Sequence, residues 1–148
     1  MELSSRPLAS SISALFTSIS VTSRSLTDFV RGVRSARQDL AHVTRELSDL
    51  RLVLELLRDD EHDIPSALRG RLDAVVRDCG AVVRRMTGVL TESAAAAVRD
   101  RNSQEADGNG RRISWQWDGE QKAETARLSV GVQTYREAMA LALEVANL

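Results

Sequence analysis

Apolar residues recur with the period of an α-helix in four long segments of the chain. Within about residues 7–33 and 35–59, they follow one another at alternating steps of four and three residues. A third segment of the same spacing begins at residue 63, and a fourth covers residues 120–147. Each segment therefore has one continuous apolar face that must be buried against another helix. This pattern predicts an all-α fold, an antiparallel helical bundle of four main helices, or five with a short extra helix.

The four stripes define the expected core. The first contains Leu8, Ile12, Leu15, Ile19, Leu26 and Val33, with Thr22 and Phe29 in the gaps. The second contains Leu40, Val43, Leu47, Leu50, Leu54 and Leu57. The third contains Leu68, Leu72, Val75, Cys79, Val82, Met86 and Val89, in which the free cysteine is expected to be a small buried hydrophobe. The fourth contains Leu128, Val132, Tyr135, Met139 and Ala142, with Leu141 and Val145 beside them.

Helix ends are marked by proline, glycine and acidic residues. Pro7 fits the first turn of the first helix, and Gly32 is a suitable stop. The acidic residues 59–63 interrupt the second stripe and predict a solvated turn, after which Pro65 can occupy an early helical position. Because these connections are short, consecutive helices are expected to be antiparallel.

A flexible loop is predicted over about residues 98–112, which have no apolar periodicity and are rich in polar residues and glycine. A loop of this length is either disordered or functional. The remainder of residues 1–148 is expected to form a single domain. Because the chain stops at Leu148 inside or just after the last helix, we expect it to be the N-terminal part of a longer protein.

Composition excludes several functional classes. The formal charge of −1 argues against a nucleic-acid binder, and the single cysteine excludes an intrachain disulfide framework and Cys-rich zinc sites. There is no Gly-rich phosphate loop and no metalloprotease or di-iron motif, and the acidic residues near His62 lie on a turn too poorly ordered to hold a metal. We therefore expect a protein that is not an enzyme and uses no catalytic residue, metal or cofactor.

The charges are distributed unevenly along the chain. Residues 7–23 carry no charge, residues 1–58 have a net charge of +2, and residues 59–63 have a net charge of −4. No segment has the length of a transmembrane helix, and the serine-rich opening segment does not resemble a signal peptide, so the cytosol is the expected compartment.

The uncharged opening helix has two compatible interpretations. It is the central helix of the bundle, buried on all sides, or it leaves the bundle and inserts into a bilayer. The candidate membrane-inserting residues are Leu8, Ile12, Leu15, Phe16 and Ile19. The candidate headgroup contacts are Arg24, Arg31, Arg34 and Arg37, which are otherwise a solvated face. Each basic residue at an anionic surface contributes about 1 kcal/mol. Of Trp115 and Trp117, at least one is expected to pack on the bundle end, the alternative being an interfacial anchor.

Several short motifs, in this order, resemble the HeLo and HeLo-like N-terminal domains of fungal signal-transducing NTPases, which are NLR-like proteins. Residues 7–12 are similar to the start of that family, with Arg6 where an acid is usual. Residues 46–54 resemble the family's second helix, and Cys79 fits the third. The sequence Ile-Ser-Trp ending at Trp115, followed by a charged helix with Ala-Leu-Ala-Leu near its end, resembles the closing element.

The resemblance implies a helical effector domain of programmed cell death and innate immunity. Such a domain precedes a nucleotide-binding module, or is activated by an amyloid-type signalling region in the same or a partner chain. It is cytoplasmic at rest; on activation it forms a homo-oligomer and targets the anionic plasma membrane through its N-terminal helix. The alternative is a helical protein-interaction or oligomerisation module without membrane activity. A more distant option is an enzyme fragment or regulatory subunit.

Overall fold

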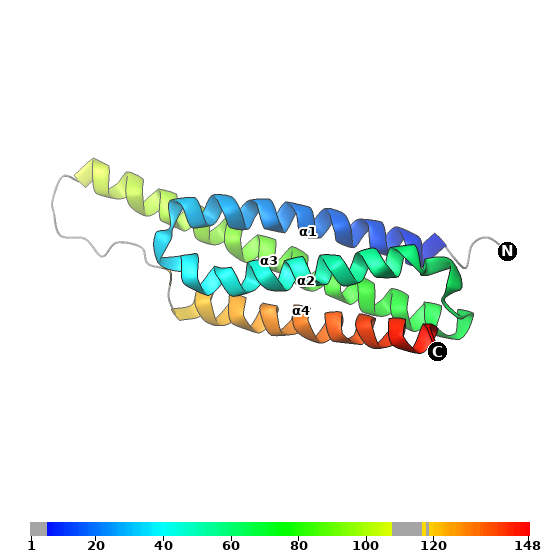
Figure 1. Cartoon of the computed structure of the whole chain (residues 1–148). Coiled ribbons are helices and arrows are strands. Elements are labelled where there is room, and N and C mark those ends of the chain that lie inside the picture. Colours follow the sequence, from blue (N-terminus) through cyan, green and yellow to red (C-terminus); the bar gives the residue numbers. More distant parts are fainter. Residues whose placement is uncertain (1–5, 108–116, 118) are drawn as a thin grey trace.

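The computed structural model describes residues 6–107, 117 and 119–148 (Figure 1). Its elements are α1 (Arg6–Gly32), η2 (Arg34–Ala36), α2 (Arg37–Asp59), η3 (Glu61–Asp63), α3 (Ser66–Asp107) and α4 (Gly119–Ala146). The described residues contain no strand. The prediction of an all-α fold with four main helices is confirmed, and the short extra elements are one-turn 3-10 helices at the two tight turns.

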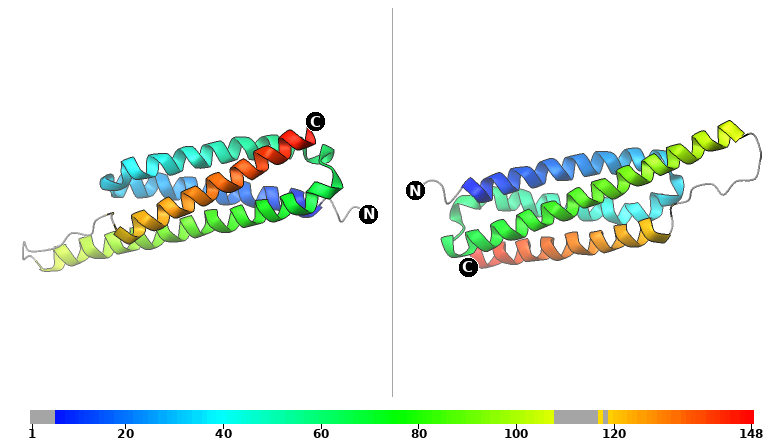
Figure 2. Two further views of the ribbon diagram at one scale, coloured as in Figure 1. Left: turned by 90° about the horizontal axis from the view of Figure 1, so that it is seen from below. Right: turned by 180° about the vertical axis from the view of Figure 1, so that it is seen from behind.

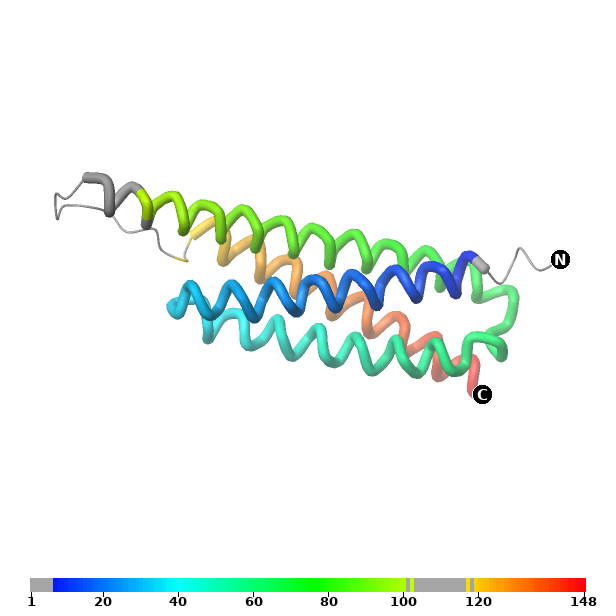
Figure 3. The backbone as a smooth tube through the Cα atoms, turned by 90° about the horizontal axis from the view of Figure 1, so that it is seen from above, coloured from blue at the N-terminus to red at the C-terminus, as the bar shows by residue number. Residues whose placement is uncertain are grey.

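The helices pack as a square in which each helix touches two others. α1 lies against α2 and α3, and α4 lies against α2 and α3 from the opposite corner (Figure 2). Consecutive helices are antiparallel, as expected, and α1 and α3 run side by side in the same direction (Figure 3). α2 and α3 follow each other in sequence but occupy diagonal corners with little contact. The α1–α2 contact is the least extensive of the four sides, and this leaves room for a groove.

One apolar core joins all four helices. Every predicted core position of α2 is buried, and on α1 the stripe is buried from Leu8 to Phe29, with Val33 partly exposed. The most deeply buried row on α3 differs from the predicted stripe and consists of Leu72, Val76, Cys79, Val83, Met86 and Leu90. The contacts of α3 with α1 and α4 are the two most extensive in the bundle, and its apolar face is two rows wide, since Val75 and Val82 of the predicted row are partly buried beside the deeper one. Val82, in the predicted row, faces Gly131 of α4.

α1 is a corner helix, so the expectation that it is central and buried on all sides is wrong. Its outward face carries small and hydroxylated residues, and Val21 on that face is 45% exposed. Thr17 and Thr27 donate hydrogen bonds to the carbonyls of Ser13 and Ser23 on the same helix. Over residues 7–23, hydroxyl groups satisfied by their own helix make an uncharged face that still tolerates water, whereas Arg24, Asp28 and Arg31 are exposed further along α1.

The predicted loop at residues 98–112 is wrong for residues 98–107, where α3 continues to Asp107. The end of α3 extends past the α1–α2 turn (Figure 1). Strong helix formers, including the alanines at residues 94–97, carry the helix beyond the last residue of the apolar stripe. Residues 108–112 of the predicted loop lie outside the described residues.

The acidic turn between α2 and α3 is only partly solvated. Asp59, His62 and Asp63 are exposed, but Glu61 is 6% exposed. Arg69 Nη1 donates to Glu61 Oε1 at 2.8 Å, Nη2 donates to the Glu61 carbonyl at 2.5 Å, and Nε donates to the Ile64 carbonyl at 3.2 Å. The prediction of a fully solvated turn is therefore corrected: one arginine from the next helix fastens the turn and neutralises its inward-facing carboxylate.

Cys79 is buried in the core, as predicted, and burial raises the pKa of its thiol to about 12. Because the thiolate is the reactive form, we expect iodoacetamide at pH 7.5 to leave the folded protein unlabelled. In about 8 M urea, which unfolds the chain, the same reagent should label one site per chain. Labelling at equal rates with and without urea, followed by mass spectrometry, would contradict the buried position.

Candidate functional site

An open groove lies between α1 and α2, beside the turn that joins them. Its volume is about 950 Å³, within the range of small-molecule sites. Its lining residues, which we call the basic groove, are Leu26, Thr27, Val30, Arg31, Arg34, Arg37, Leu40, Ala41 and Thr44. Three of the four arginines that the sequence singled out are thus brought together around one groove. Arg24 is exposed on α1 and does not line it.

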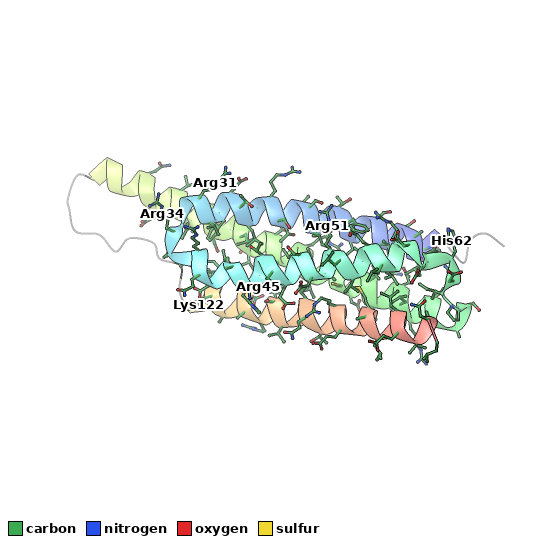
Figure 4. The ribbon with its side chains drawn as sticks, viewed as in Figure 1. Arg31, Arg34, Arg45, Arg51, His62 and Lys122 are labelled. Atoms are coloured by element: carbon green, nitrogen blue, oxygen red, sulfur yellow. The ribbon has the colours of Figure 1, made fainter. Side chains whose placement is uncertain are left out.

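The turn itself places the three arginines. Arg31 is in the last turn of α1, Arg34 begins η2 and Arg37 begins α2, so an arginine stands at each element boundary. The backbone N–H of Val33 donates to the Phe29 carbonyl at 2.8 Å, and Ala36 is fully buried beneath the turn. Figure 4 shows Arg31 and Arg34 at this end of the bundle. Ala36 faces the core, and Arg31, Arg34 and Arg37 are exposed on the solvent side of the turn.

The groove arginines are not engaged in ion pairs with any described residue, although the exposed Asp28 lies about one turn from both Arg24 and Arg31 on α1. Within the described part of the chain, none of the groove arginines forms an ion pair, and neither does Arg24. The acidic residue in the first turn of α2, Asp39, lies 3.6 Å from Lys122 Nζ of α4. The lining includes no carboxylate. The groove therefore presents guanidinium donors that are free to bind an anion.

The floor of the groove is apolar. Leu26 is 2% exposed, Leu40 is fully buried, and Val30 is partly buried beside them. The hydroxyls of Thr27 and Thr44 already donate to the carbonyls of Ser23 and Leu40 at 3.0 Å each. The groove thus combines a rim of guanidinium groups with an aliphatic floor, and the O–H donors of its two threonines are already used within their own helices.

Trp117 packs on the bundle, as predicted for at least one of the tryptophans. It is 4% exposed, and its ring meets Phe29 of α1 edge-on, with centroids 5.3 Å apart. Its indole Nε1 is buried without a hydrogen-bond partner among the described atoms. Trp115 lies outside the described residues.

The candidate membrane-inserting residues lie in the core. Leu8, Ile12, Leu15 and Ile19 are each at most 2% exposed, whereas Phe16 is partly exposed and the guanidinium of Arg58 stands 4.9 Å above its ring. Those four residues therefore stabilise the folded bundle, and the structure separates them from the groove at the other end of α1.

A polar seam between α1 and α3 was missed by sequence reasoning. Ser11 Oγ donates to Asp73 Oδ1 at 2.5 Å, and the hydroxyls of Thr22 and Thr87 lie 2.5 Å apart. Thr22 also donates to the Val83 carbonyl at 3.3 Å. The one available signal was Thr22, a polar residue within the apolar stripe of α1. The α1–α3 contact therefore includes polar side chains among its apolar ones.

A family model described as pigment biosynthesis cluster protein PigL N-terminal matches residues 5–107. The match covers α1, α2 and α3, including the whole basic groove and the polar seam. No curated protein and no solved structure matches the chain. No helix in the described ranges is both long and apolar enough to cross a membrane. The same ranges contain no cluster of three or more His, Cys, Asp or Glu side chains suited to a metal ion.

Proposed function

The chain belongs to the family of the pigment biosynthesis cluster protein PigL N-terminal region, and on this premise we propose that it is a HeLo-like, non-enzymatic effector domain. In this proposal the domain serves cell-death or immune signalling, rests in the cytoplasm and oligomerises on activation at the anionic plasma membrane. The family description itself names an N-terminal region, which agrees with a signalling partner region elsewhere in the same or another chain. The HeLo-like motifs on the first three helices lie within the matched residues.

Binding to an anionic membrane is supported by four arginines at the α1–α2 end of the bundle that form no ion pair among the described residues. Arg31, Arg34 and Arg37 surround the groove, and Arg24 lies two helical turns away on α1. Basic side chains near an anionic surface each contribute about 1 kcal/mol. The folded bundle can therefore dock on a membrane through this end without any change of fold.

Insertion would be a second and separate step. The apolar residues of α1 are in the core at rest, and burying each such side chain stabilises the bundle by about 1.5–3 kcal/mol. Release of α1 from the bundle must therefore be offset by lipid contact and by oligomer contacts. Release requires α1 to leave both α2 and α3, and water can replace the hydrogen bonds of the polar α1–α3 seam when it does.

The docking step is tested by co-sedimentation with vesicles of phosphatidylcholine, with and without anionic lipid. We expect the triple variant Arg31→Gln/Arg34→Gln/Arg37→Gln to bind anionic vesicles roughly a hundredfold more weakly than the parent, from about 1 kcal/mol per arginine. Binding by the parent should also weaken as salt is raised.

The matched control removes three other exposed arginines, Arg51, Arg71 and Arg84, and should bind nearly as well as the parent. Circular dichroism checks that both variants are folded. Equal sedimentation of the groove variant and the parent, or failure of the parent to sediment with anionic vesicles, would overturn the docking step.

The alternative is a protein-interaction or oligomerisation module without membrane activity. The observation that favours it is a pair of exposed leucines one turn apart on α2, Leu52 and Leu56, which are 60% and 58% exposed. If this function holds, light scattering will show a concentration-dependent dimer that Leu52→Ser/Leu56→Ser abolishes, and the parent will not sediment with vesicles.

A further inference from the structure

The basic groove has a composition that selects the chemistry of its occupant. Its polar rim consists of the guanidinium groups of Arg31, Arg34 and Arg37, which donate hydrogen bonds and accept none. The threonine hydroxyls in the lining already donate to backbone carbonyls of their own helices. The free donors of the lining are therefore the guanidinium groups, and they call for a ligand with an acceptor-rich anionic group.

The floor adds a second requirement. Leu26, Val30 and Leu40 form an aliphatic surface beside the arginines, and the lining includes no aromatic ring on which a base could stack. A free phosphate ion would use the rim and leave this floor exposed to water. A ligand that uses both parts is an amphiphile with its phosphate at the rim and its hydrocarbon on the floor.

We propose that the basic groove binds one anionic phospholipid molecule, with its phosphate held by Arg31, Arg34 and Arg37 and its first acyl carbons on the aliphatic floor. This inference rests on the proposed function and names the lipid class that the docking step would recognise. Because the lining has no carboxylate to pair an ammonium group, a headgroup of phosphate alone is preferred over phosphatidylserine and over phosphatidylcholine.

The test is a titration of the whole chain with dihexanoyl phosphatidic acid below its micelle concentration, followed by calorimetry and backbone NMR shifts. Dihexanoyl phosphatidylserine, dihexanoyl phosphatidylcholine and inorganic phosphate are titrated in parallel. We expect saturable binding of phosphatidic acid at least about tenfold tighter than that of any of the other three, a difference of about 1.4 kcal/mol.

Ala41 lines the groove and is exposed, so a larger side chain at this position changes the groove without disturbing the packing of the core. Ala41→Glu places a carboxylate among the arginines and should weaken phosphatidic acid binding at least about tenfold. The matched control, Ala81→Glu on the exposed side of α3, should bind as the parent does. Unchanged binding by Ala41→Glu would show that the groove is not the site.

Two results separate this inference from the proposed function. If inorganic phosphate binds as tightly as phosphatidic acid, or if the parent sediments with anionic vesicles but binds no short-chain lipid, the lipid groove is overturned and membrane docking stands. If short-chain phosphatidic acid binds but the parent does not sediment with anionic vesicles, the groove stands and membrane docking is overturned.

Discussion

Oxidised Thr22→Cys/Thr87→Cys protein is expected to bind anionic vesicles and to release none of their trapped dye. The two hydroxyl oxygens lie 2.5 Å apart across the α1–α3 seam, close to the sulfur–sulfur distance of about 2 Å in a disulfide. A crosslink there holds α1 to α3 and prevents the release that insertion requires. The groove arginines are untouched, so docking should persist while leakage is lost.

Dithiothreitol provides the control within the same sample, because reduction should restore dye release to the level of the parent. Cys79 does not compete for the crosslink, since its pKa of about 12 keeps it protonated at neutral pH. This design is sharper than placing a charge at Leu15 or Ile19, each 1% exposed, where loss of folding and loss of insertion would coincide. Equal leakage by the oxidised and reduced forms would overturn the release of α1.

Arg136→Met is expected to lower the free energy of unfolding by about 3 kcal/mol, because it leaves a buried carboxylate without its cation. Arg136 Nε of α4 lies 3.5 Å from Glu46 Oε2 of α2, and the Glu46 side chain is 10% exposed. Both atoms are buried without a hydrogen-bond partner, so the contact between them is electrostatic. The 22% exposure of the Arg136 side chain places the expected loss at the low end for buried pairs.

Urea unfolding followed by circular dichroism measures this loss. The double variant Glu46→Met/Arg136→Met should recover most of the stability, since apolar side chains of similar volume replace a buried ion pair at little cost. As a control, Arg127→Met breaks a pair in which the arginine is 73% exposed and should cost less than about 1 kcal/mol. A single variant as stable as the parent would show that the buried pair contributes nothing to the α2–α4 contact.

The apolar stripes of α1 and α2 were predictable from the helical period, and that of α3 was predictable only in part. The α2 stripe from Leu40 to Leu57 is buried as predicted, and Gly32 ends α1 as expected. On α3 the predicted stripe includes Val75 and Val82, whereas Val76 and Val83 are the more deeply buried residues. α3 makes the two most extensive helix contacts, with α1 and α4, so its apolar face is wide, and periodicity alone does not say which of two adjacent rows is the more deeply buried.

Of the candidate site, the sequence indicated the residue types but not their grouping. Arg31, Arg34 and Arg37 stood out by their spacing after an uncharged helix, and the structure brings them around one groove. Arg24 was equally prominent in the sequence and does not line that groove. Two carboxylates that seemed ordinary surface acids, Glu46 and Glu61, are buried against arginines from other helices, and no local pattern marks such pairs.

The sequence by itself determined that this chain forms four amphipathic helices with an aliphatic core, since the period of its apolar residues leaves no other way to bury them. Only the tertiary structure decided which helices are neighbours. Placing α2 and α3 on a diagonal makes α1 a corner helix, opens the groove along its thinnest contact and sets a polar seam on its other side. These outcomes depend on contacts between residues far apart in the chain, which a one-dimensional periodicity does not contain.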